Sequence, residues 1–146
     1  MLILMFLFVP CVLAQDTLYN KSNTGYNAIY VNNLTITLNN TDANVTMDYE
    51  LDVFTKFYLF MFGGGAIEIE LKSILMGFDN ITTKEIGEES AVFHIDGVSY
   101  CEDGFHVIDS RKLNQEVGNL TVEFTDGTSM RYRNIERVPK IRYLCS

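Results

Sequence analysis

Three cysteines and two histidines are the residues of this 146-residue chain best suited to redox or metal chemistry. Cys11 lies in an apolar leader that we expect to be removed, so Cys101 and Cys145 would remain in the mature chain. An even number of cysteines in an exported chain indicates a disulfide. We therefore predict a Cys101–Cys145 bond, with two unpaired buried thiols as the alternative.

A transition-metal site would have to use the same part of the chain. The candidate ligands are His94, Cys101, His106 and the nearby carboxylates Asp96, Glu102 and Asp103. No two of them have a familiar ligand spacing such as CxxC or HxxxH, and a metal-bound Cys101 conflicts with the disulfide. We predict structural or surface histidines, no metal site and no cofactor.

The sequence also selects no catalytic residue. Nucleophilic catalysis needs a nucleophile, a base and an orienting group, and no GxSxG or catalytic-cysteine context accompanies the two histidines. Asp48, Glu50 and Asp52 follow one strand face at a period of two, where we expect solvated carboxylates, with calcium binding as the alternative. We predict a protein without enzymatic activity.

Sequons for N-glycosylation are more frequent than chance predicts. Twelve Asn and nineteen Ser or Thr would give roughly 1.6 sequons by chance, and the chain has six. They begin at Asn20, Asn33, Asn39, Asn44, Asn80 and Asn119. Three of them fall on the polar phase of predicted strands, so we predict N-glycosylation, with an Asn/Thr-rich hydrophilic face as the alternative.

Charge is distributed unevenly along the chain. Residues 1–104 contain four Lys or Arg against fourteen Asp or Glu, a net charge of −10, whereas residues 105–146 contain seven against five, a net charge of +2. The overall charge of −8 argues against a general nucleic-acid binder. The basic C-terminal residues are Arg131, Arg133, Arg137, Lys140 and Arg142. We consider them a possible binding site for an anionic partner; cross-strand pairs with acidic residues are the alternative.

The first 14 residues contain no charge and are nearly all apolar. They are too few to span a bilayer comfortably, which takes about 20 residues, and Val12 and Ala14 fit a cleavage site after Ala14. We predict a signal peptide over residues 1–14, with an uncleaved anchor as the alternative. Membrane contact is expected only through this segment, if it is uncleaved. The polar composition of residues 15–27 predicts a flexible entry segment, and residues 28–146 fit a single domain.

The largest apolar block of the mature chain lies within residues 44–78. Residues 44–53 alternate apolar and polar side chains, as in a half-buried strand, and residues 28–38 have the same pattern. The two predict a hairpin that turns at residues 39–42. Residues 54–62 are densely apolar without a clean period, so we predict a buried helix; a buried strand and an interfacial membrane segment are the alternatives.

Turn signals divide the rest of the chain. Gly63-Gly64-Gly65 predicts a tight turn into a second helix over residues 66–76, with an anion-binding loop as the alternative. Asp96-Gly97, Asp103-Gly104 and Asp126-Gly127 are typical hairpin turns. The predicted strands are 81–85, 91–95, 98–101, 105–108, 120–124, 129–133 and 140–144.

The run FTKFYLFMFGGGAIEIELKSIL, the leader before Gln15 and the terminal VPKIRY resemble small exported proteins of uncharacterised function in methanogenic archaea. This resemblance covers residues 44–143 and contains no functional motif. It implies an exported α+β domain of an archaeal envelope and identifies no site residue.

We predict an α+β fold in which a helical hairpin, residues 54–76, packs on the apolar face of an antiparallel meander. The expected function is that of an exported, disulfide-bonded and N-glycosylated domain that acts at the cell envelope through surface contacts with an unknown partner. A small secreted ligand-binding or inhibitor module is the alternative, and a secreted hydrolase with an unrecognised site is a second one.

Overall fold

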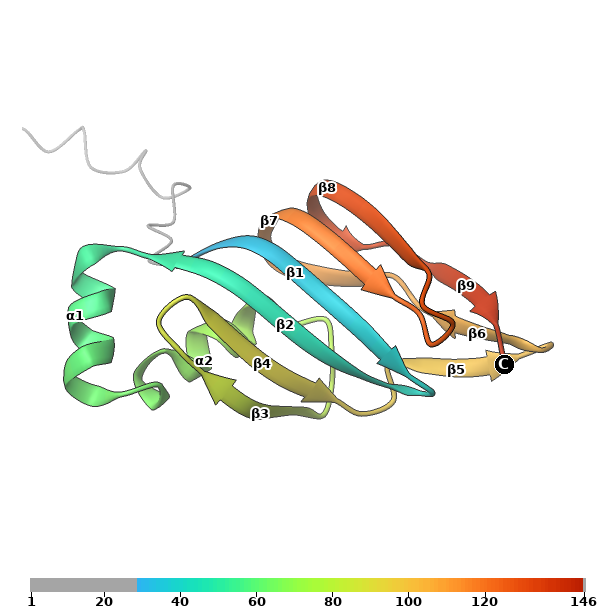
Figure 1. Ribbon diagram of the computed structural model, residues 1–146, viewed down its shortest axis with the longest axis horizontal. Coiled ribbons are helices and arrows are strands. Elements are labelled where there is room, and N and C mark those ends of the chain that lie inside the picture. The colour runs from blue at the N-terminus through green and yellow to red at the C-terminus, as the bar shows by residue number, and fades with distance from the viewer. Residues whose placement is uncertain (1–28, 146) are drawn as a thin grey trace, which may run out of the picture.

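The computed structural model describes residues 29–145, so the predicted signal peptide, the predicted entry segment (residues 15–27) and Asn20 lie outside the described residues. Within this range the fold is α+β, as predicted. A six-stranded sheet has the order β3-β4-β2-β1-β7-β8, and a three-stranded sheet has the order β5-β6-β9 (Figure 1). Two helices follow β2 in the chain.

The predicted first hairpin is confirmed. β1 (Ile29–Asn39) pairs antiparallel with β2 (Asp42–Leu51), and Asn40 occupies the turn with a φ of 55°. Apart from the exposed Tyr30, the apolar side chains of both strands are buried, as their period of two predicts. A bulge interrupts the pairing between Val31 and Asn33.

The sheet is not a simple antiparallel meander, because β7 (Arg111–Glu123) returns to lie parallel to β1. β8 (Ser129–Val138) then pairs antiparallel with β7 through the turn at Asp126-Gly127. Both strands extend well beyond the predicted ranges 120–124 and 129–133. Alternation within a strand shows which side chains are buried but not which strand lies beside it, so the parallel pair could not be predicted.

The other edge of the large sheet is made by β4 (Ser90–Ile95), which pairs with β2, and β3 (Ile81–Ile86). β5 (Ser99–Glu102) and β6 (Phe105–Ile108) form the hairpin predicted at Asp103-Gly104, and β9 (Ile141–Leu144) pairs with β6. The hairpin predicted at Asp96-Gly97 is wrong, because β4 and β5 belong to different sheets. The chain uses this turn to leave the first sheet for the second.

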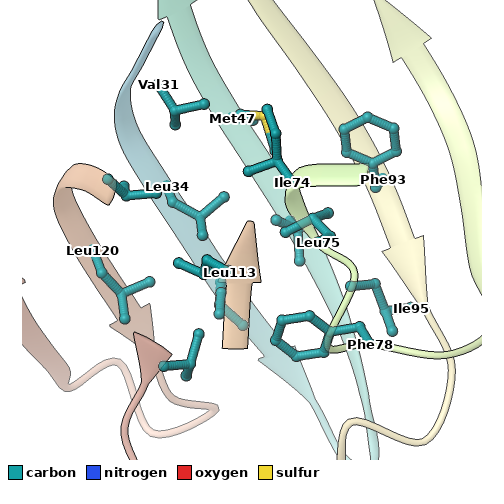
Figure 2. Packing of buried hydrophobic residues seen from close by; sticks show 14 of the residues in the cluster. Val31, Leu34, Met47, Ile74, Leu75, Phe78, Phe93, Ile95, Leu113 and Leu120 are labelled. Atoms are coloured by element: carbon teal, nitrogen blue, oxygen red, sulfur yellow. The ribbon is translucent and has the colours of Figure 1, made fainter. Parts of the chain in front are cut away.

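The core lies on one face of the large sheet, where α2 (Gly65–Ile74) supplies buried Ile67, Leu71 and Ile74. The segment after α2 adds Leu75 and Phe78, and Figure 2 shows these side chains close to residues of β2, β4 and β7. At roughly 1.5–3 kcal/mol for each large apolar side chain, this burial is a major stabilising contribution.

α1 (Val53–Phe62) is helical, which supports the predicted helix over the strand alternative for residues 54–62. The expectation that it is buried is wrong, because Leu59 is its one buried residue. Figure 1 shows α1 at one end of the molecule, beyond the end of β2, whereas the C-terminus lies at the opposite end. α2 therefore supplies most of the buried helical side chains, and the predicted packing of the whole hairpin on the sheet is not confirmed.

Candidate functional site

The most unusual surface of the described residues is formed by α1. Its exposed apolar side chains, each at least half accessible to solvent, are Val53, Phe54, Phe57, Tyr58, Phe60, Met61 and Phe62. We call these seven residues the α1 patch. Phe54 is 81% exposed and Phe60 is 80% exposed, so the patch does not belong to the core. Its five aromatic residues expose a surface area on the order of 700 Å² to water. This is a larger apolar area than most soluble proteins expose in one place.

The α1 patch covers most of the circumference of the helix. Successive residues of an α-helix are rotated by about 100°, which places Thr55, Lys56 and Leu59 on one side. Leu59 is only 8% exposed, so this side faces the body of the protein. The exposed apolar residues occupy the remaining arc of about 200°.

Local interactions explain why α1 keeps its helical form despite its small buried area. The Asp52 carboxylate caps the helix by accepting a hydrogen bond of 2.8 Å from the Thr55 amide. Gly63 ends the helix with a φ of 77°, and its amide donates to the Leu59 carbonyl oxygen at 2.7 Å. The Tyr58 and Phe62 rings lie 4.5 Å apart on the outer side. Ile69 of α2, which is 84% exposed, adds a further apolar side chain on the neighbouring helix.

Beside α1, a hollow of about 420 Å³ has a strongly acidic lining. Its charged residues are Asp48, Glu50, Lys56, Glu88 and Glu89. Asp48 and Glu50 are therefore neighbours of α1, whereas Asp52 caps the helix and does not continue the predicted carboxylate stripe. Asn32 donates to Glu50 Oε1 at 3.0 Å and Asn33 donates to Asp48 Oδ2 at 3.4 Å. Both carboxylates therefore already accept a hydrogen bond from an asparagine side chain.

The predicted disulfide partners are brought together. Cys101 Sγ lies 3.0 Å from Cys145 Sγ, which is longer than a bond of about 2.05 Å, so the described structure holds two adjacent thiols. A hydrogen bond to Cys101 raises the pKa of the Cys145 thiol to about 11. The His106 ring stacks on Tyr143 at 4.9 Å, and its Nδ1 lies 3.4 Å from Cys101 Sγ.

Four of the candidate metal ligands fall into two groups, and Glu102 and Asp103 belong to neither. One consists of Cys101, His106 and Cys145, and the other of Asp42, His94 and Asp96; within each group the donor atoms lie within 4.8 Å of one another. In the second group, His94 contacts Asn44 Oδ1 at 2.9 Å and Asp96 Oδ1 at 3.2 Å. Asp42 was missed in the sequence because only the pairing of β2 with β4 brings it near His94. Both groups have internal hydrogen bonds that explain their geometry without a metal ion.

The basic C-terminal residues do not form one site. Lys140 approaches Asp109 at 3.7 Å, Arg142 lies over the Phe105 ring at 4.9 Å, and Arg137 contacts Ser110 Oγ at 3.5 Å. Arg131 and Arg133 share one face of β8, as predicted, and line a second hollow of about 450 Å³. None of the ion pairs found within residues 29–145 includes either of these two arginines.

The five sequon asparagines that lie within residues 29–145 are all exposed: Asn33, Asn39, Asn44, Asn80 and Asn119. Asn33 and Asn119 pair in register on β1 and β7, and Asn119 Nδ2 donates to Asn33 Oδ1 at 3.1 Å. Both also line the hollow that contains Arg131 and Arg133. Two glycans at such close positions would crowd each other and cover these arginines.

Comparison with known proteins finds no matching family model, curated protein or solved structure. Neither helix within residues 29–145 combines the length and the hydropathy that crossing a bilayer requires.

Proposed function

We propose that this chain is an exported domain of the cell envelope that works by surface contact rather than by catalysis, and that α1 is its contact element. The observation that carries the proposal is the exposure of the α1 patch. Soluble monomers rarely expose a contiguous apolar area of this size, and such areas are typical of interaction surfaces.

The contrast between the two helices supports this division of roles. α2 buries Ile67, Leu71 and Ile74 against the large sheet and therefore stabilises the fold. α1 buries Leu59 alone, although most of its residues are apolar. The hairpin is anchored on the sheet by α2 and presents α1 outward.

The expectations of export, disulfide formation and glycosylation fit the same proposal. Cys101 and Cys145 are adjacent, and oxidation in an extracellular compartment would join them. Asn33, Asn44 and Asn119 would carry sugars on the outer face of the large sheet, opposite the core. In this arrangement no sugar is attached to α1 itself, and only a sugar on Asn33 would border the hollow beside the helix.

The proposal is tested by fractionating envelopes from cells that produce variant chains. Phe57→Ser combined with Phe60→Ser replaces two exposed side chains, so the fold should persist and association with the envelope should fall. Met130→Ser combined with Leu144→Ser is the matched control, because these residues are also exposed but lie on β8 and β9. Equal association of the two double variants would contradict a role for α1.

A second candidate function, the binding of an anionic ligand, is favoured by the hollow lined by Arg131 and Arg133. Neither arginine has an acidic partner among the described ion pairs, so both guanidinium groups are available where Asn33 and Asn119 carry no glycan. Replacing both with Glu should weaken envelope association, and added salt should weaken it in the wild-type protein. Unchanged association by a folded double variant would show that this face is only solvated.

A further inference from the structure

The width and position of the α1 patch also indicate what it contacts. We propose that the occupant is a lipid bilayer, and that α1 inserts into the interfacial layer of a membrane with uncharged or zwitterionic headgroups. This inference rests on the proposed function and identifies its partner.

The first argument is geometric. A helix that docks in a protein groove needs an apolar stripe little more than 100° wide, whereas α1 exposes apolar side chains over about 200°. A partner protein would have to enclose the helix on several sides to cover Phe54, Phe60 and Phe62 together. A bilayer surrounds an inserted element on every side that faces away from the protein. With ten residues, α1 is about 15 Å long, enough for the interfacial layer but too short to cross a membrane.

The second argument is the position of the chain that precedes the described residues. Ile29 pairs with Leu51, and α1 begins two residues later at Val53. The 28 residues before Ile29 therefore join the molecule at the end where α1 lies. Residues 1–14 are uncharged and nearly all apolar, and the 14 residues that follow can reach up to about 45 Å. Uncleaved, residues 1–14 would hold this same end at a membrane; cleaved, α1 would provide the contact.

The third argument concerns the charges around α1. Lys56 is the one basic residue of the helix, and the adjacent hollow contributes Asp48, Glu50, Glu88 and Glu89. An excess of carboxylates would be repelled by anionic headgroups. The apolar surface must then provide the attraction, so binding should survive high salt.

The absence of tryptophan from the chain allows a direct test. The full chain carrying Phe57→Trp has a single tryptophan, which lies in the α1 patch and can be excited separately from the tyrosines, and the matched control carries Met130→Trp on β8. Vesicles of phosphatidylcholine with brominated acyl chains should shift the Phe57→Trp emission to the blue and quench most of it, at low salt and in 1 M NaCl. The Met130→Trp emission should stay unchanged, even if residues 1–14 anchor the chain.

Three results would overturn the bilayer proposal. The first is no quenching of Phe57→Trp, or equal quenching of both probes. The second is emission from Phe57→Trp that is already blue-shifted without vesicles, because another part of the same chain would then cover α1. The third is a concentration-dependent dimer that the Phe57→Ser and Phe60→Ser variant disrupts, which would make a second copy the occupant. If α1 is not quenched by lipid but the double Ser variant still leaves the envelope, the surface function stands and only the lipid assignment fails.

Discussion

Two glycines illustrate how single residues determine the path of this backbone. Gly118 of β7 faces the bulge in β1, where a Cβ atom would lie 2.8 Å from the Asn32 carbonyl oxygen. Gly65, the first residue of α2, has no atom within 4 Å of the corresponding position. The parallel β1–β7 pairing therefore depends on the missing side chain of Gly118.

We expect Gly118→Ala to lower the free energy of unfolding by about 1–3 kcal/mol, because the rigid backbone of β1 must move to admit the methyl group. Gly65→Ala is the matched control and should leave stability unchanged or raise it by up to about 1 kcal/mol. Urea unfolding of both variants measures the difference. Equal free energies of unfolding for the two variants would show that β1 can move away from β7 without an energetic cost.

The Cys145 thiol should react slowly with alkylating reagents in the reduced protein. Its pKa is raised from 9.0 to about 11, chiefly by the hydrogen bond to Cys101, so the reactive thiolate is scarce at pH 8 and increases until the pH approaches 11. Cys101→Ala removes that hydrogen bond and should increase the alkylation rate at pH 8 roughly tenfold, because the larger thiolate fraction is partly offset by the lower nucleophilicity of a thiolate with a lower pKa. Alkylation of Cys145 followed by mass spectrometry provides the rate, and equal rates in both proteins would exclude this cause.

At the scale of elements, α1 is a helix stabilised more by its ends than by its packing. Asp52→Ala removes the cap on the Thr55 amide and should cost about 1 kcal/mol. Because α1 buries one residue, the loss should increase amide hydrogen exchange within α1 and leave the sheet unaffected. Asp52→Asn retains a capping oxygen and serves as the control. Faster exchange throughout the sheet would contradict the independence of α1.

The sequence predicts individual strands better than it predicts which strands lie side by side in the sheet. Alternation identified β1 and β2, and Asp-Gly turns located two hairpins correctly, because these signals depend on residues close in sequence. The parallel partner of β1 comes from 86 residues further along the chain, as the Asn33–Asn119 pair shows, and no local pattern carries that information. The exposure of α1 was missed for a related reason. An apolar helix without a clean period is normally interior, and only the tertiary arrangement reveals that nothing within residues 29–145 covers it.

At the scale of the whole molecule, the two ends are built from different elements. α1 and the start of β1 lie at one end, and the small sheet lies toward the C-terminal end (Figure 1). β5 and β9 are not paired with each other, since β6 lies between them. No hydrogen-bonded pairing joins β5 to β9. The Cys101–Cys145 contact therefore connects the two outer strands of the small sheet directly.

We predict that the exported protein has a Cys101–Cys145 disulfide. The two sulfur atoms are 3.0 Å apart, so closing the bond requires a shift of about 1 Å. The enclosed loop of roughly 45 residues would raise the free energy of unfolding by about 4 kcal/mol in the chain-entropy description. Intact mass after alkylation, with and without prior reduction, detects the bond, and urea unfolding under both conditions measures its effect. Cys101→Ala combined with Cys145→Ala should match the reduced protein and should not respond to reductant. Two alkylatable thiols at these positions in protein taken directly from the native envelope would refute the prediction. In that case His106 would remain beside two free sulfur atoms, a donor set suited to a soft metal ion.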